Sequence, residues 1–251
     1  MLLKIKCEIR KMKILLRSIP SPVVTLFAVS VIMMNLLANK SISLPVDWLA
    51  LDCGIIVSWI SFMSMDMVTK HFGPRAATEL SLFAVLINLL ICLFFFIAGI
   101  IPGAWGESFV DTGSEMINNA LDRTFIGNWY VLFGSTVAFV ASALINNFSN
   151  YFIGRLTHKK KDGFATYALR TYVSTAIGQF CDNMIFALIV SHLLFGWTIL
   201  QCITCSVTGM VVELVCEAAF SPIGFSVCKK WKRENVGWEY FETIKNQVET
   251  K

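Results

Sequence analysis

Hydrophobic residues gather in six long runs separated by short polar connections. The runs cover about residues 22–40, 47–67, 79–102, 129–154, 170–195 and 198–228. Each run matches the roughly 20 apolar residues that a helix needs to cross a bilayer, and the last is long enough to tilt or bend. The pattern predicts an all-α membrane protein with six transmembrane helices.

The connections leave no room for a soluble domain, so we expect a single polytopic membrane domain over residues 1–251. The longest connection, about residues 103–128, is polar and acidic, and we expect a short surface helix there. The first 17 residues are basic and no small-residue cleavage pattern follows them. They indicate a retained cytoplasmic tail over about 1–20, with a second tail over about 229–251.

Composition supports membrane insertion. Hydrophobic residues make up 56% of the chain and charged residues only 15%, against about 25% charged in a typical soluble domain. Most of the eight cysteines lie inside the apolar runs, where a thiol behaves as a small hydrophobe. Cys202 and Cys205 form one C-x-x-C pair without a second pair or nearby histidine, so we expect neither disulfides nor zinc.

Lysine and arginine residues collect in alternate connections. The two tails and the second and fourth connections hold 19 of the 21, which leaves Lys40 and Arg123 on the opposite side. Cytoplasmic segments carry such an excess of basic residues, so both termini are predicted to be cytoplasmic. The net charge of +4 then reflects topology, and we expect a lipid bilayer and no nucleic acid as partner.

Polar side chains inside the runs are the candidate functional residues, because such groups are costly at membrane depth. They are Asn35, Asn39, Asp66, Asn88, Asn146, Asn147, Asn150, Gln179, Asp182, Asn183, Glu213 and Glu217. Residues three or four apart share a helix face. Three sets do so: Gln179 with Asp182 and Asn183, Glu213 with Glu217, and Asn146 with Asn150.

Depth brings three of these residues to the same level. At about 1.5 Å per residue, Asn88, Asp182 and Glu213 fall within about a turn of their run's midpoint. Three helices are therefore predicted to converge on one polar site near the bilayer centre, where transporter substrate sites tend to lie. A single buried Asn also has a simpler interpretation, a hydrogen bond to a neighbouring helix.

The two mid-membrane carboxylates are harder to explain by packing alone. Asp182 and Glu213 have no obvious Lys or Arg partner within the runs. They must be protonated, hydrated or paired with a cationic or hydrogen-bond-donating ligand. Asp66 instead has the i, i+4 spacing of an ion pair with Lys70 at the end of a helix.

Enzymatic and metal chemistry find little support. An intramembrane enzyme using Asp182 and Glu213 as an acid–base pair is one alternative, but the paired signatures of intramembrane aspartyl proteases are absent. The three histidines have no metal-ligand spacing, and no P-loop occurs. We expect no enzyme activity, metal or cofactor.

Three stretches resemble the queuosine precursor transporters, also called the vitamin uptake transporter family: SWISFMSMDMVTKHFGPRAA, ALRTYVSTAIGQFCDNMIFALIV and VVELVCEAAFSPIG. The likeness runs from about residue 22 to 228. Its most specific pieces are two spaced patterns. These are Asp66, Gly73 and Ala77 in the first, and Ser174, Thr175, Gly178, Gln179 and Asp182 in the second.

The resemblance implies a bacterial inner-membrane importer of 7-deazaguanine bases, such as the 7-cyano or 7-aminomethyl form or queuine, for queuosine in tRNA. It implies a six-helix core similar to the substrate-binding subunits of energy-coupling-factor transporters. Many relatives place Glu where this chain has Lys70. A substrate-binding subunit that needs a separate ATP-driven module is the alternative, and a homo-oligomer or an energy-coupling partner stays open.

Such a base offers a ring N–H and an exocyclic amine that one carboxylate accepts together. We expect one of Asp182 and Glu213 to make this contact and the other to bind a cationic 7-substituent. Phe180 or Phe186 is expected to stack on the ring. The predicted substrate-binding residues are Asp182, Glu213, Gln179, Asn183, Asn88, Asn147, Asn150, Glu217, Asp66 and Asn35.

Overall fold

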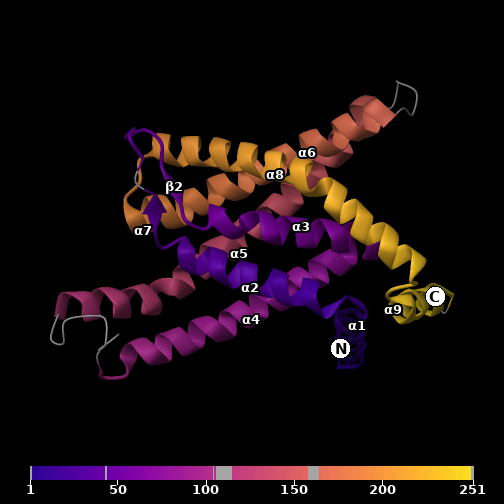
Figure 1. The fold of residues 1–251 in the computed structure, drawn as a ribbon, viewed down its shortest axis with the longest axis horizontal. Coiled ribbons are helices and arrows are strands. Elements are labelled where there is room, and N and C mark those ends of the chain that lie inside the picture. The colour runs from indigo at the N-terminus through magenta and orange to yellow at the C-terminus, as the bar shows by residue number, and fades with distance from the viewer. Residues whose placement is uncertain (1, 43, 104, 106–114, 158–163, 250–251) are drawn as a thin grey trace. The chain divides into compact units, whose positions relative to one another are not determined.

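A computed structural model describes residues 2–42, 44–103, 105, 115–157 and 164–249, and these are helical apart from one short β-hairpin and the connections (Figure 1). In chain order the elements are α1 Leu2–Ser18, α2 Ser21–Leu37, β1 Ser41–Ile42, β2 Leu51–Asp52, α3 Ile55–Phe72, α4 Pro74–Ile100, α5 Glu115–Thr157, α6 Phe164–Phe186, the π-helix η1 Ala187–His192, α7 Leu193–Phe195, α8 Ile199–Arg233 and α9 Trp238–Glu249.

Within the described residues, four segments are long and apolar enough to cross a membrane: Pro74–Ile100, Glu115–Ser142, Thr175–Phe195 and Ile199–Phe220. Helices α1 and α2, bent by 108° at their junction, give a fifth if they form one broken span. Helix α3, with 18 residues, is not among these segments, because Asp66, Lys70 and His71 lower its hydropathy. The fold is therefore an all-α, multi-pass membrane protein, and the count of six spans stays a prediction.

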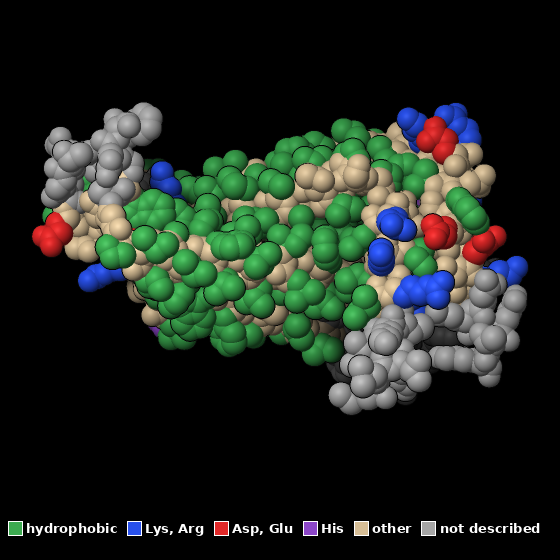
Figure 2. Space-filling model, turned by 90° about the horizontal axis from the view of Figure 1, so that it is seen from below, with side chains coloured by type: hydrophobic (Ala, Val, Ile, Leu, Met, Phe, Trp, Pro, Cys, Tyr) green, Lys and Arg blue, Asp and Glu red, His purple; other side chains and the backbone are tan. Residues whose placement is uncertain are grey.

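The outward side of α4 shows what surrounds these helices. Leu82, Leu86, Leu89 and Leu93 are each more than half exposed, although this helix is the most apolar of the four. Hydrophobic side chains form a broad area on the face drawn in Figure 2, and Lys and Arg side chains lie outside that area. An apolar surface of this extent indicates contact with lipid.

The chain divides into two compact units. Unit 1 comprises Met1–Met34, Ile56–Leu90 and Cys216–Lys251, and unit 2 comprises Asn35–Ile55 and Ile91–Val215. Helices α2, α4 and α8 each contribute residues to both. The two units are described separately below.

Unit 1 is organised around the turn between α3 and α4. Gly73 makes this turn with φ of +93°, a left-handed conformation that costs glycine little. Ala77 is 4% exposed in the core that follows. Lys70 Nζ lies 3.3 Å from Asp66 Oδ2, which confirms the predicted ion pair. The Asp66, Gly73 and Ala77 pattern thus has a structural explanation within this helical hairpin.

Both chain ends are helical where the sequence suggested tails. Helices α1 and α9 lie against each other, and Leu15 and Tyr240 are buried in the same core as Phe72. His71 Nε2 lies 2.9 Å from the carbonyl oxygen of Val236, in the connection before α9. Both helices are amphipathic and pack their apolar residues against the core. Their many charged residues keep the mean hydropathy low, so a hydropathy profile does not reveal these helices.

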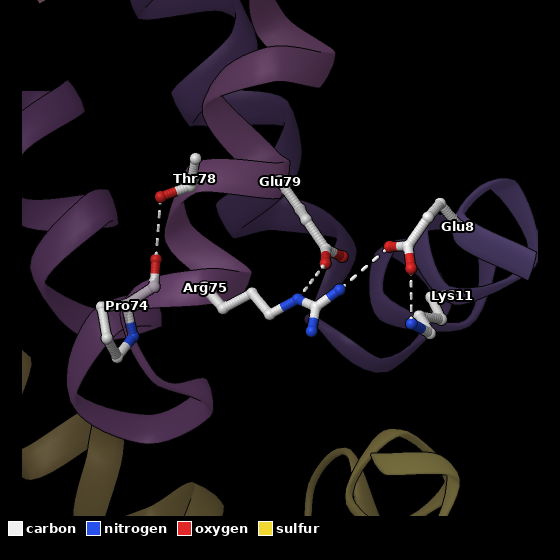
Figure 3. A network of polar contacts seen from close by, with 6 residues as sticks. All are labelled: Glu8, Lys11, Pro74, Arg75, Thr78 and Glu79. Atoms are coloured by element: carbon white, nitrogen blue, oxygen red, sulfur yellow. Dashed lines mark hydrogen bonds and ion pairs between the residues drawn. The ribbon is translucent and has the colours of Figure 1, made fainter. Parts of the chain in front are cut away.

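A surface network also holds α1 to the start of α4 (Figure 3). Arg75 donates through its Nη2 to Glu8 Oε2 at 3.0 Å and through its Nε to Glu79 Oε1 at 3.1 Å. Glu8 pairs with Lys11 as well. The Arg75 side chain is 63% exposed, so each pair contributes well under about 1 kcal/mol.

Unit 2 contains the hairpin and the closest helix packing. Strands β1 and β2 pair antiparallel, with Ser41 opposite Asp52. Helix α5 lies beside α6, and the continuation of α6 widens into η1 before Gly196 ends it with a φ of +73°. A π-helical segment inside a span often lies at a functional site.

Some expected boundaries shift. Helix α3 begins at Ile55 instead of about 47, because the preceding backbone is held in a loop of unit 2. Gln201 donates to the carbonyl of Asp47 at 2.9 Å, and Thr204 to that of Trp48 at 2.8 Å. The surface helix expected within about 103–128 instead forms the start of α5, which continues into the span.

Candidate functional site

The centre of the candidate site is Asp182 on α6. The Ser142 hydroxyl of α5 lies 2.9 Å from Asp182 Oδ1 and 3.0 Å from the carbonyl of Phe139. A hydroxyl has one proton to donate, so Ser142 shares it between two acceptors. Within the part of the chain that the structure describes, Asp182 Oδ2 has no hydrogen-bond partner, which leaves the carboxyl able to accept further hydrogen bonds.

Glu213 of α8 faces the same part of α6. Its side chain is 6% exposed, and Asn183 Nδ2 lies 3.4 Å from both of its carboxylate oxygens. Gly209, one turn before Glu213, leaves room for this amide. A Cβ at Gly209 would lie 2.8 Å from Asn183 Nδ2, so a larger residue there would displace the amide from this position.

A third carboxylate, Asp52, comes from strand β2. Asp182 and Asp52 both lie close enough to Glu213 to interact with it electrostatically, and the Cys205 thiol of α8 lies beside the Asp52 backbone. We call Asp52, Asp182 and Glu213 the carboxylate cluster. Four elements of unit 2, namely β2, α5, α6 and α8, bring it together with Ser142 and Asn183.

Asp52 and Ser142 were not among the predicted site residues. Asp52 lies within the apolar run 47–67, and a carboxylate in such a run is the signal that should have marked it. Ser142 carries no comparable signal, because serine is common in membrane helices and often bonds its own backbone.

Burial raises the pKa of Asp52 from its ordinary value near 3.8 to about 6. Between about pH 4 and 6 the folded protein then binds more protons than the unfolded chain, so stability falls as pH rises through this window. We expect a loss of about 3 kcal/mol, at about 1.4 kcal/mol per unit. The measurement is thermal unfolding of the detergent-solubilised protein from pH 4 to 7.

The variant Asp52→Asn isolates this effect from other titrations. Asp52 Oδ1 accepts a hydrogen bond from the Gly54 N–H at 2.7 Å, and the Asn oxygen can replace it. The variant should therefore show a shallower decline with pH and a higher Tm at pH 7. Equal slopes for both proteins would refute the assignment.

Of the other predicted site residues, some lie in unit 2 and some have side chains that the structure does not describe. Gln179 lies on α6 one turn before the cluster, and its Oε1 is buried without a hydrogen-bond partner among the described residues. Asn35 is buried at the start of unit 2, 4% exposed. The side chains of Asn147, Asn150 and Glu217 lie outside those that the structure describes.

Asn88 and Asp66 belong to unit 1. Asp66 forms the ion pair with Lys70 described above and is partly exposed. Asn88 is fully buried on α4. The predicted convergence of Asn88 with Asp182 and Glu213 stays a prediction, whereas the approach of Asp182 and Asn183 to Glu213 is present in unit 2.

The cluster can accept hydrogen bonds or positive charge. The ion pairs that the structure describes are all in unit 1 and involve none of Asp52, Asp182 and Glu213. Among the same described residues, no three His, Cys, Asp or Glu side chains are grouped to hold a metal ion. A buried Glu213 beside two partly buried carboxylates, none of them paired with a described cation, suits a ligand that donates hydrogen bonds.

Comparison with known protein families gives one match. A family model described as "Putative vitamin uptake transporter" matches residues 52–227. This range contains the whole carboxylate cluster. Comparisons with curated proteins and with solved structures gave no match.

Proposed function

The chain belongs to the vitamin uptake transporter family, and from this membership we propose that it imports queuosine precursors, 7-deazaguanine bases, across a bacterial inner membrane. The observation that carries the proposal is the carboxylate cluster, three acidic side chains without a described cationic partner inside an apolar helical unit. A purine-like base that donates two parallel hydrogen bonds is complementary to such a group.

The arrangement in unit 2 suggests roles for single residues. Glu213 accepts hydrogen bonds from the ring N–H and the exocyclic amine of the base through its two oxygens. The Asn183 amide, 3.4 Å away, then either moves aside or keeps its contact with Glu213 beside the base. Asp182 accepts from a 7-aminomethyl group, which is cationic. Gln179 offers its unpartnered Oε1 and its amide N–H groups to the remaining edge.

The test is uptake of radiolabelled 7-aminomethyl-7-deazaguanine into proteoliposomes that contain only this protein. Saturable uptake, inhibited by unlabelled 7-cyano-7-deazaguanine but not by thiamine, supports a stand-alone carrier. Binding without accumulation would indicate a substrate-binding subunit that needs an energy-coupling partner. Neither binding nor uptake would contradict the proposed substrate.

Topology is a separate part of the proposal. With six spans and both termini inside, green fluorescent protein fused after Gly73 or Lys232 should fluoresce, and alkaline phosphatase fused after Lys40 or Gly196 should be active. The reason is the distribution of basic residues. If α3 does not cross, fusions after Lys40 and Gly73 will report the same side of the membrane.

A further inference from the structure

One face of α1 is basic and exposed. Arg10, Lys13 and Arg17 are spaced by three and four residues, which places them in one stripe along the helix. All three residues are exposed, and none of them takes part in the ion pairs that the structure describes. We call these three residues the basic stripe. Its positive charge is therefore available to an anionic partner.

The basic stripe faces away from the interior of unit 1. Leu15 lies between Lys13 and Arg17, two residues from each, and two residues correspond to about 200° around an α-helix. Leu15 is 0% exposed and packs in the same core as Phe72 and Tyr240. Because the side of α1 opposite to the stripe is buried, the stripe is turned toward the surroundings of the protein.

The bend between α1 and α2 sets the direction of the stripe relative to the bilayer. Helix α2 has no charged residue, and Leu26 and Val29 are about half exposed, as side chains in contact with lipid are. With α2 across the bilayer, the bend of 108° leaves α1 nearly perpendicular to the membrane normal. Helix α1 then runs along the membrane surface. Its six Lys and Arg residues agree with this position, because charges are costly inside the hydrocarbon.

The basic stripe lies at the depth of the lipid headgroups. Arg17 comes four residues before Ser21, the first residue of α2, and a span ends where the headgroups begin. Since α1 runs along the surface, Lys13 and Arg10 stay close to the same depth. Ile9, the neighbour of Arg10, is 62% exposed. An exposed apolar side chain beside basic residues is typical of helices that lie in a membrane interface.

We propose that the basic stripe of α1 binds the headgroups of anionic phospholipids and holds this helix on the membrane surface. An Arg guanidinium donates two hydrogen bonds to a phosphate group, and long Arg and Lys side chains bend toward the phosphates while the helix stays at one depth. A zwitterionic headgroup carries a cationic amine beside its phosphate, so it is expected to bind less well. Helix α1 also contacts α9 and the start of α4, so bound lipid stabilises this part of unit 1.

The experiment measures lipid binding by the full-length protein, purified and delipidated in a neutral detergent. Fluorescent phosphatidylglycerol and phosphatidylcholine with the same acyl chains are the two ligands. Wild type should bind phosphatidylglycerol at least tenfold more tightly, because one basic residue near an anionic surface contributes a factor of about five. Raising NaCl from about 0.1 to 1 M should abolish most of this preference, since the Debye length falls from about 10 to 3 Å.

The triple variant Arg10→Gln/Lys13→Gln/Arg17→Gln should lose the preference for phosphatidylglycerol and keep the affinity for phosphatidylcholine. Gln has nearly the helix propensity of Lys and Arg, and the three residues are exposed, so we expect α1 to fold. Arg10→Lys/Arg17→Lys keeps the charge and should keep the preference. An undiminished preference in the Gln variant would overturn the inference.

Lys11→Gln and Lys13→Gln form a matched pair, because both remove one positive charge from α1. Lys13 belongs to the stripe, whereas Lys11 Nζ lies 2.6 Å from Glu8 Oε1 and the Lys11 side chain is 12% exposed. Lys13→Gln should weaken phosphatidylglycerol binding about fivefold, and Lys11→Gln by less than about twofold. Equal losses would mean attraction by net charge alone, which overturns the inference. Complete displacement of the lipid by an excess of inorganic phosphate would overturn it as well, since the stripe would then bind soluble anions.

Discussion

Uptake by Glu213→Gln is expected to fall by about a hundredfold under conditions where wild type takes up 7-aminomethyl-7-deazaguanine. The substitution keeps the shape of the side chain but replaces one acceptor oxygen with an amide NH2, which only donates, and removes the charge. Hydrogen bonds to a charged group are worth about 1.5–3 kcal/mol each, and each 1.4 kcal/mol corresponds to a factor of ten. Asn183, 3.4 Å from both oxygens, cannot compensate for the missing acceptor.

Asp182→Asn should have a ligand-dependent effect. If Asp182 accepts from the cationic 7-aminomethyl group, its variant loses affinity for this base by more than tenfold and for the neutral 7-cyano base much less. The Ser142 hydroxyl at 2.9 Å can still donate to an Asn oxygen, so the local structure should persist. Equilibrium binding to purified protein with both ligands measures the difference.

Matched controls come from the same chain. Glu8→Gln changes a carboxylate that is 55% exposed in the surface network with Arg75, and Asp47→Asn changes an exposed residue. Both should keep wild-type uptake. Full uptake by both Glu213→Gln and Asp182→Asn would exclude the carboxylate cluster as the binding site, even if the protein transports the base.

Hydropathy and charge distribution predicted the class of protein, because long apolar runs and basic connections follow directly from the cost of placing charge in lipid. Membership of the vitamin uptake transporter family and the Asp66–Lys70 ion pair also followed from the sequence and are confirmed. The ion pair follows from the spacing of two residues on one helix, and the family from motifs along the chain. A single sequence contains both kinds of information.

Lateral contacts between helices could not be predicted in the same way. Asp182 and Glu213 were identified as candidates by their depth, but their approach to Asp52 and Ser142 depends on how β2 and α5 pack. Helices exposed to lipid have no polar face that marks their partner, since lipid and protein interior are equally apolar. The hairpin before α3 was missed for a similar reason, as its residues lie inside an apolar run.

Small residues decide this lateral packing, and Gly134 of α5 gives the sharpest case. A Cβ at this position would lie 2.4 Å from Cγ2 of Val190 in η1, and 3.3 Å from Cγ2 of Ile189. Val190 is 0% exposed and, being β-branched, has little rotamer freedom. Gly134→Ala must therefore push α5 away from η1.

We expect Gly134→Ala to lower stability by about 1–3 kcal/mol, as overpacking does, and Tm by several degrees. Gly127→Ala, the same change seven residues earlier in α5, provides the comparison. A Cβ at Gly127 would meet nothing within 4 Å, so this variant should gain about 0.5–1 kcal/mol from helix propensity. Thermal unfolding of both variants in one detergent measures the contrast. If the two variants change Tm in the same direction, close packing of α5 on η1 does not stabilise unit 2.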